Sequence, residues 1–149
     1  MKLNIKALDE RIGKEIPAPR YATDGAAAMD LCACTEEAVV IPAGERRVIP
    51  TGIAIALPDR NYVALLFARS GLGIKKGICL ANGVGVIDSD YRGEIRVGLA
   101  NISGEDYTVM PGDRIAQLMI APVICPEVSF VSELDETQRG AGGLGSTGR

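Results

Sequence analysis

The sequence predicts an all-β domain, either a barrel or a sandwich of short strands. Its 18 glycines and 8 prolines are scattered between short apolar runs, a rhythm typical of strands joined by turns. Some of these runs alternate apolar with polar or small residues, and no long amphipathic helix is evident. With 149 residues, 47% of them hydrophobic, the chain is long enough for one domain with its own core.

The apolar runs indicate two kinds of strand. Residues 94–99 alternate polar or small with apolar side chains, as a strand with one buried face does, and residues 53–57 alternate in a similar way. Residues 62–67 and 115–123 are more continuously apolar, which is typical of strands buried on both faces. The sequence therefore predicts both half-buried and fully buried strands.

Helical structure is expected in two short stretches at most. The first is Leu72 to Lys76, which follows a Ser70-Gly71 turn, and the second lies near Glu133 to Gln138. Neither stretch is longer than a turn or two, so neither changes the predicted fold class.

The composition excludes several classes of function. Sixteen Lys and Arg against 19 Asp and Glu give a net charge of -3, which argues against a nucleic-acid-binding domain that relies on a broad basic surface. The chain has no histidine, so imidazole bases, Ser/His/Asp triads and histidine zinc sites are excluded. Acid–base chemistry must therefore fall to carboxylates, while local arginines can still bind a small anion.

The chain is expected to be soluble and cytoplasmic, without membrane contact. Residues 1–17 carry charges throughout, and no apolar run is long enough to span a bilayer. The cysteines form no C-x-x-C pair and are interpreted as reduced thiols in the core: Cys32, Cys34, Cys79 and Cys125. Residues 101–103 match the N-glycosylation sequon, which has no consequence without a secretory signal.

Polar clusters stand beside three of the apolar runs. Residues 68–73 place an arginine, a serine and two glycines where backbone N–H groups can cradle an anion, although a plain strand-to-turn junction reads the same way. Residues 85–94 crowd two carboxylates, a tyrosine and an arginine into one turn, and ordinary hairpin loops also collect such residues. Residues 112–117 repeat the pattern, and Asp30 reads as a turn or edge carboxylate.

The last stretch, residues 139–149, differs in composition from the rest. It reads RGAGGLGSTGR and has too little apolar surface to fold alone. Its match to G-x-G-x-x-G lacks the strand and helix of a dinucleotide-binding unit. We expect residues 1–138 to form a single domain and residues 139–149 a flexible arm, which is either a frayed tail or a flap that orders on phosphates.

Taken in order, these segments resemble the five motifs of the trimeric deoxyuridine triphosphatase (dUTPase) family. The third is the most diagnostic, because its Ile-Asp-x-Asp-Tyr-Arg-Gly-Glu string is long and rarely arises by chance. The resemblance extends over essentially the whole chain, through residues 27–31, 69–72, 85–94, 112–117 and 139–148.

The resemblance implies a distorted β-barrel or jelly-roll-like subunit of the dUTPase type. It also implies a homotrimer with active sites at the subunit interfaces, where residues 139–149 of one subunit close over a site of another. The implied reaction is hydrolysis of dUTP to dUMP and pyrophosphate by attack of water on the α-phosphorus, with Mg²⁺ on the triphosphate. This reaction limits uracil incorporation into DNA and supplies dUMP for thymidylate synthesis.

The resemblance also implies a role for each site residue. Asp88 activates the water, which suits a carboxylate that is ionised at pH 7, and Asp30 holds Mg²⁺ through a water. Tyr91 packs under the deoxyribose and excludes a 2′-OH, and Asn82 reads the uracil edge. The phosphate oxygens are held by Arg69, Ser70, Gly71, Gln117 and, from another subunit, Arg139. Asp90 and Arg114 support the site.

Two residues depart from the family pattern. Leu144 stands where an aromatic residue usually stacks on the uracil, and Ala28 stands where glycine is usual. Ala28 would strain its loop if the position needs a positive φ. The alternatives are a dCTP deaminase-like enzyme and a non-catalytic dUTP-sensing regulatory protein of the same fold.

Overall fold

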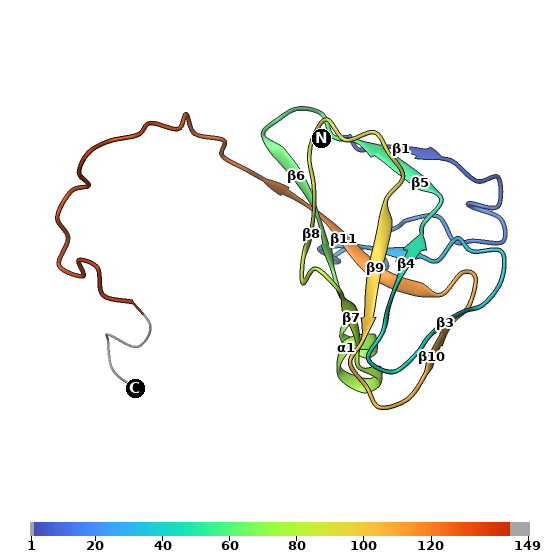
Figure 1. The fold of residues 1–149 in the computed structure, drawn as a ribbon. Coiled ribbons are helices and arrows are strands. Elements are labelled where there is room, and N and C mark those ends of the chain that lie inside the picture. Colours follow the sequence, from blue (N-terminus) through green and yellow to red (C-terminus); the bar gives the residue numbers. More distant parts are fainter. Residues whose placement is uncertain (1, 144–149) are drawn as a thin grey trace.

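The computed structural model describes residues 2–143, and strands dominate it (Figure 1). The strands are β1 (Asn4–Ala7), β2 (Met29–Cys32), β3 (Val39–Ile41), β4 (Arg46–Pro50), β5 (Ile53–Ala56), β6 (Tyr62–Phe67), β7 (Ile78–Leu80), β8 (Gly85–Ile87), β9 (Arg96–Asn101), β10 (Tyr107–Val109) and β11 (Arg114–Pro122). One helix, α1 (Ser70–Lys76), lies between β6 and β7. The all-β prediction is confirmed.

The strands pair antiparallel in four sheets. The largest has the order β2-β11-β6-β8, a second has the order β4-β9-β7, and the pairs β1-β5 and β10-β3 complete the set. Within residues 2–143 these sheets do not close into one barrel, so the fold is a distorted jelly-roll.

A single main core holds the sheets together. Strand β9 alternates exposed or half-buried residues with buried ones, so Val97 and Leu99 face the core as the sequence predicts. Burying an aliphatic side chain of this size contributes about 1.5 to 3 kcal/mol. Strand β6 departs from the prediction, because Ala64 and Leu66 are buried while their neighbours are only half-buried. The second face of β6 is therefore not fully covered by the described chain.

Helix α1 forms where a short helix is expected, but it begins two residues earlier, at Ser70. It ends at Lys76 and is capped by Gly77, whose φ of 64° suits glycine and whose N–H donates to the Gly73 backbone oxygen. Lys75 and Lys76 lie in the last turn, where positive charge offsets the helix dipole.

The second expected helix, near Glu133 to Gln138, is wrong. Between Val123 and Gly143 the described chain contains no helix or strand, and it runs away from the sheets (Figure 1). An isolated turn of helix is costly to nucleate, and this stretch is exposed, with no core surface to pack against. None of the helical structure described for the chain is long and apolar enough to cross a membrane.

The prediction of core cysteines is only partly right. Cys32 and Cys34 are buried, Cys79 is half-buried, and Cys125 is exposed in the stretch beyond β11. All four are free thiols.

Asn101, at the end of β9, is a buried polar residue with 1% of its surface exposed. Its Nδ2 donates hydrogen bonds to the backbone oxygens of Ile41 (2.9 Å) and Glu105 (2.8 Å). Its Oδ1 accepts from the N–H and the hydroxyl of Ser103 at 3.0 and 2.7 Å. The amide therefore ties the β9–β10 connection to β3, with every polar atom satisfied.

Candidate active site

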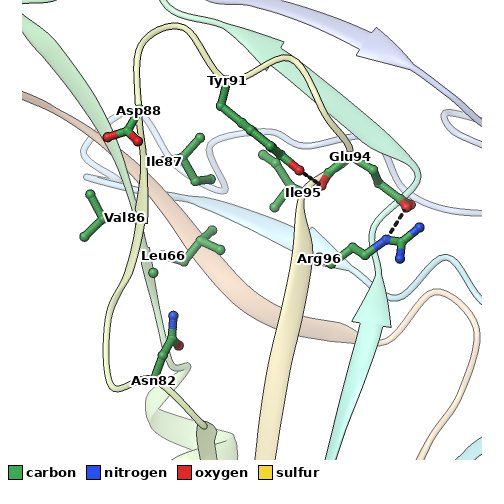
Figure 2. Close-up of a pocket in the computed structure, with 10 residues that line it drawn as sticks. Leu66, Asn82, Val86, Ile87, Asp88, Tyr91, Glu94, Ile95 and Arg96 are labelled. Carbon is green, nitrogen blue, oxygen red and sulfur yellow. Dashed lines mark hydrogen bonds and ion pairs between the residues drawn. The ribbon is translucent and has the colours of Figure 1, made fainter.

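A pocket of about 270 Å³ opens between β8 and β9 (Figure 2). Three residues singled out in the sequence line it together, namely Asn82, Asp88 and Tyr91. Leu66 and Ile95 contribute apolar walls. An amide, a carboxylate and an aromatic ring around an apolar floor form a site that suits a small molecule with both polar and apolar parts.

Strand β8 sets the direction of Asp88. Gly85 pairs with Leu66 of β6, and a Cβ at Gly85 would lie 2.9 Å from the Cβ of Leu66, so only glycine fits there. Ile87 is buried, so Asp88, the next residue, turns the other way and is exposed. Within residues 2–143 no hydrogen bond or ion pair reaches its carboxylate, which leaves both oxygens available to a ligand.

The loop after Asp88 is braced by its own side chains. Tyr91 donates its backbone N–H to the Asp88 backbone oxygen at 3.2 Å and its hydroxyl to the Glu94 backbone oxygen at 2.9 Å. The Arg92 guanidinium donates to the backbone oxygens of Ser89 and Tyr91 at 2.8 and 2.9 Å. The loop thus presents the Tyr91 ring to the pocket in a fixed position.

A second group of site residues lies on the β2-β11-β6 part of the large sheet. We call Asp30, Arg69, Arg114 and Gln117 the arginine cluster. Asp30 on β2 lies opposite Gln117 on β11, and Gln117 lies opposite the last residue of β6, so Arg69 follows close by.

Asp30 is the centre of the arginine cluster. Its Oδ1 accepts from Arg69 Nε at 3.0 Å and from Gln117 Nε2 at 3.5 Å. Its Oδ2 accepts from Arg114 Nη1 at 3.1 Å. The Asp30 side chain is 15% exposed, whereas that of Arg114 is 56% exposed. The carboxylate therefore holds two guanidinium groups at the surface, where they can meet an anion.

Ser70 and Gly71 continue this surface in the first turn of α1. Ser70 is exposed, and open space lies beside Gly71 where a side chain would be. Nearby, burial raises the pKa of the Cys32 thiol, and the negative charge of Asp30 raises it further. Cys32 therefore stays protonated and is no nucleophile.

The remaining candidate residues lie apart from these groups. Asp90 is exposed in the turn before Tyr91, and Arg139 is exposed beyond β11, where its Nε donates to the Gly142 backbone oxygen at 2.8 Å. Leu144 lies outside the described residues. The strain considered for Ala28 does not arise, because no residue other than glycine has a positive φ between residues 2 and 143.

The structure thus brings the candidate residues together in two groups rather than one. Neither Arg69 nor Gln117 is among the described residues that line the pocket. Glu94 does line it, and sequence reasoning gave this residue no role although it closes the most diagnostic motif. The sequence signal for Glu94 was its place directly after Gly93. Only the structure shows that Gly93 packs against the Tyr91 ring.

A metal ion would find few protein ligands here. The part of the chain that the structure describes has no group of three or more His, Cys, Asp or Glu side chains arranged to hold one. Each oxygen of Asp30 already accepts a hydrogen bond from an arginine, so a directly bound ion would compete with these two guanidinium groups. Mg²⁺ usually keeps several waters and binds through few carboxylates plus substrate phosphates, so Asp30 fits it only through a water.

Comparison with known proteins points in one direction. A sequence model of the dUTPase family matches residues 14–148. The deoxyuridine 5′-triphosphate nucleotidohydrolase of Idiomarina loihiensis is 51% identical over 148 residues, which cover 99% of this chain and 98% of that protein. The protein of the same name from Hahella chejuensis is 52% identical over 146 residues, or 98% and 96% of the two chains.

Solved structures give the same result. The Staphylococcus bacteriophage 80alpha dUTPase with dUPNHPP has a TM-score of 0.86 and 28% identity, covering 99% of both chains. A mutant dUTPase from phage phi11 of S. aureus has a TM-score of 0.79 and 26% identity, covering 91% of this chain and all of the other. That structure is described as revealing the coordination of a structural Mg(II) ion. The chain belongs to the dUTPase family.

Proposed function

We propose that the protein hydrolyses dUTP to dUMP and pyrophosphate, with Asp88 as the general base. The reaction limits uracil incorporation into DNA and supplies dUMP for thymidylate synthesis. The observation that carries the proposal is the pocket that Asp88, Asn82 and Tyr91 line, with the Asp88 carboxylate unengaged within residues 2–143. A chain without histidine needs such a carboxylate to take a proton from water.

The hydrolysis consumes one water, and one carboxylate accepts the proton that this water loses. Asp88 accepts a proton as the water oxygen bonds to the α-phosphorus, and the bond from that phosphorus to the bridging oxygen breaks. Pyrophosphate leaves with the electron pair of that bond. The proton on Asp88 then returns to solvent or to the product.

Tyr91 and Asn82 select the nucleoside. The Tyr91 ring, held through its hydroxyl, packs under the deoxyribose and leaves no room for a 2′-OH. Asn82 hydrogen-bonds the uracil edge, and a wrong base leaves buried polar groups without hydrogen-bond partners. Tyr91→Ala should therefore lower the ratio of kcat/KM for dUTP over UTP, whereas an unchanged ratio would remove the ring from sugar selection.

The phosphates bind at the arginine cluster and the start of α1. Arg69, Ser70, Gly71 and Gln117 hold phosphate oxygens, and Arg114 supports them. Arg139 contributes charge to the γ-phosphate from the arm of another subunit, and Leu144 covers the uracil. Asp30 would hold Mg²⁺ through a water, together with the substrate phosphates, and the ion would neutralise charge on the triphosphate.

We extend the proposal to a homotrimer with its active sites between subunits. Two observations support it. The pocket and the arginine cluster do not share one cavity in the described chain, which is consistent with a complete site formed by residues of two copies. Beyond β11 the chain also exposes a set of large apolar side chains, which need a surface to cover them: Ile124, Val128, Phe130, Val131 and Leu134.

Two truncations test this assembly. Deleting the proposed arm, residues 139–149, should preserve a mass near three times 15.7 kDa by light scattering. The same deletion should cut kcat sharply, because a closing arm supplies charge and excludes water. Deleting 123–149 should instead dissociate the trimer. An active monomer, or a fully active protein without its arm, would contradict the proposal.

One product assay tests the reaction. The protein is incubated with Mg²⁺ and, separately, dUTP, dCTP, dTTP and UTP, and nucleotide products and pyrophosphate are measured. Release of dUMP and pyrophosphate from dUTP alone supports the proposal. Conversion of dCTP would indicate a deaminase-like enzyme, and tight dUTP binding without product would indicate a regulatory sensor.

A further inference from the structure

Glu94 connects the pocket to a distant turn of the chain. Its Oε1 accepts the backbone N–H of Gly52 at 3.0 Å, in the turn between β4 and β5. Its Oε2 accepts Arg96 Nε at 2.9 Å (Figure 2). The Glu94 side chain is 21% exposed while that of Arg96 is 66% exposed, so the bond to Gly52 is the more sheltered of the two.

Gly52 is a fixed point to which Glu94 can be tied. It is buried, its φ is +68°, and a Cβ there would lie 2.6 Å from the sulfur of Cys34. Its carbonyl accepts the N–H of Leu8 at 2.8 Å. One backbone hydrogen bond, from the Ile95 N–H to the Ile53 oxygen at 2.9 Å, completes the attachment on the other side. The Glu94 carboxylate thus supplies the acceptor that the Gly52 N–H needs at this turn.

The same residue holds Tyr91 from its backbone. The Tyr91 hydroxyl donates to the Glu94 carbonyl at 2.9 Å, so the ring position depends on where residue 94 is held. Gly93 lies beneath the ring: a Cβ there would be 2.5 Å from the ring carbon Cζ and closer still to the hydroxyl oxygen. The ring therefore rests on bare backbone, and its outer end is tied to residue 94.

We propose that Glu94 is a positioning residue for sugar selection: its carboxylate, tied to Gly52, fixes the carbonyl that holds the Tyr91 ring. Glu94 touches no reacting atom in this proposal. The inference rests on the proposed function, in which the Tyr91 ring excludes the 2′-OH. A ring that swings by a fraction of an ångström admits the extra hydroxyl, so the discriminating power of Tyr91 is set partly by Glu94.

The test compares selectivity, not only rate. For each variant kcat/KM is measured with dUTP and with UTP at saturating Mg²⁺, and the ratio is taken. Glu94→Ala should lower the ratio by about tenfold, the scale expected for losing a hydrogen bond to a charged group. Glu94→Gln keeps an Oε1 acceptor for Gly52 and should stay within about threefold of wild type, since the exposed pair with Arg96 contributes little.

A matched control variant and a double variant distinguish a positioning role of Glu94 from general damage to the fold. Glu45→Ala removes an exposed carboxylate that pairs only loosely with Arg47, at 3.8 Å, and should leave the ratio unchanged. Tyr91→Phe removes only the hydroxyl link and should also lower the ratio. The double variant of Glu94→Ala and Tyr91→Phe should have a ratio no lower than that of the less selective single variant, because both changes break the same series of contacts.

The outcomes are distinct. A folded Glu94→Ala protein with the wild-type ratio, or effects of Glu94→Ala and Tyr91→Phe that multiply, would overturn the inference. If Glu94→Ala fails to fold, the ratio of Tyr91→Phe decides. An unchanged ratio in Tyr91→Phe would overturn the inference. A lowered ratio in Tyr91→Phe, together with a wild-type ratio in Glu94→Gln, would support it. Wild-type protein that hydrolyses neither nucleotide would overturn the proposed function itself, whereas active wild type with an indifferent Glu94 overturns only the inference.

Discussion

The two carboxylates at the centres of the two site regions are held in opposite ways. Asp30 gives both of its oxygens to Arg69 and Arg114, while Asp88 has no partner for its carboxylate within residues 2–143. Asp30 is 15% exposed at its side chain, and Asp88 stands exposed at the edge of the pocket. The oxygens of Asp30 are occupied by arginine donors, whereas those of Asp88 are free to accept a hydrogen bond from a water.

This difference indicates that the arginine cluster and the pocket have different functions. The arginine cluster is built to bind charge, because its carboxylate fixes two guanidinium groups that together exceed its own charge. The pocket is built for shape and proton transfer, with a ring, an amide and an acid around apolar walls. Loss of chemistry should therefore follow changes in the pocket, and loss of phosphate affinity should follow changes in the arginine cluster.

The largest effect is expected from Asp88→Asn. The amide keeps the size of the side chain but cannot accept the proton, so kcat with dUTP should fall by about 10² or more while binding changes only a few-fold. Single-turnover kinetics and dUTP titration measure the two separately. Asp24→Asn, an exposed acid outside both regions, is the control, and near-normal kcat in Asp88→Asn would refute the assignment.

An intermediate effect is expected from Arg69→Gln. Removing the guanidinium takes away a charged donor to phosphate, which should lower kcat/KM by roughly 10- to 100-fold, mainly through KM. It also leaves Asp30 with one cation instead of two, so the melting temperature should fall slightly. Arg20→Gln, at an exposed position, is the matched control. A fall in kcat alone, as in Asp88→Asn, would break the division between the two regions.

The smallest effect is expected from Asp9→Asn, which alters a carboxylate–arginine pair outside the site. The Arg11 side chain, with an added bond from the Arg11 backbone, holds the pKa of Asp9 well below its usual range. Because the folded-state pKa is lowered, the pair stabilises the protein above the unfolded-state pKa of about 3.9, and that contribution is lost as the pH falls towards the folded-state value.

The measurement for Asp9 is the melting temperature of both proteins between pH 7 and pH 3. Asp9→Asn should melt a few degrees lower at pH 7, and the gap should narrow below about pH 4, because Asp9 of the unfolded chain takes up a proton there while Asp9 of the folded protein stays ionised. Its kcat/KM for dUTP should match wild type. A gap that grows as the pH falls would show that the Asp9–Arg11 pair does not stabilise the fold in this way.

Sequence reasoning located four of the eleven described strands, β5, β6, β9 and β11, because short-range apolar patterns mark them. Alternation placed the inward residues of β9, and β6 was bounded correctly from its continuous apolar run. The helix near Glu133 to Gln138 was wrong because local sequence does not reveal whether a segment has a surface to pack against. Whether alanine in place of glycine at position 28 strains its loop likewise depends on the φ angle there, which only the structure gives.

Residues of the candidate site were predictable one by one, but their contacts were not. Arg69 lies 39 positions from the carboxylate that it pairs with, and the Glu94 carboxylate lies 42 positions from the Gly52 N–H. Such pairs are set by sheet register, which depends on the whole fold rather than on neighbouring residues. The grouping into a pocket and an arginine cluster therefore emerged only from the structure.

The buried amide of Asn101 sets a limit on how this protein can be produced. It lies in an Asn-Ile-Ser sequon, and its Nδ2, the atom that carries an N-linked glycan, already donates to the backbone at Ile41 and Glu105. A sugar transferred to the unfolded chain in a secretory pathway would remove those bonds and force a bulky polar group against β3. Secretion from a eukaryotic host should therefore yield misfolded, glycosylated protein unless Ser103 is replaced by alanine, which keeps the backbone N–H bond to Asn101 and loses only the bond from the Ser103 hydroxyl.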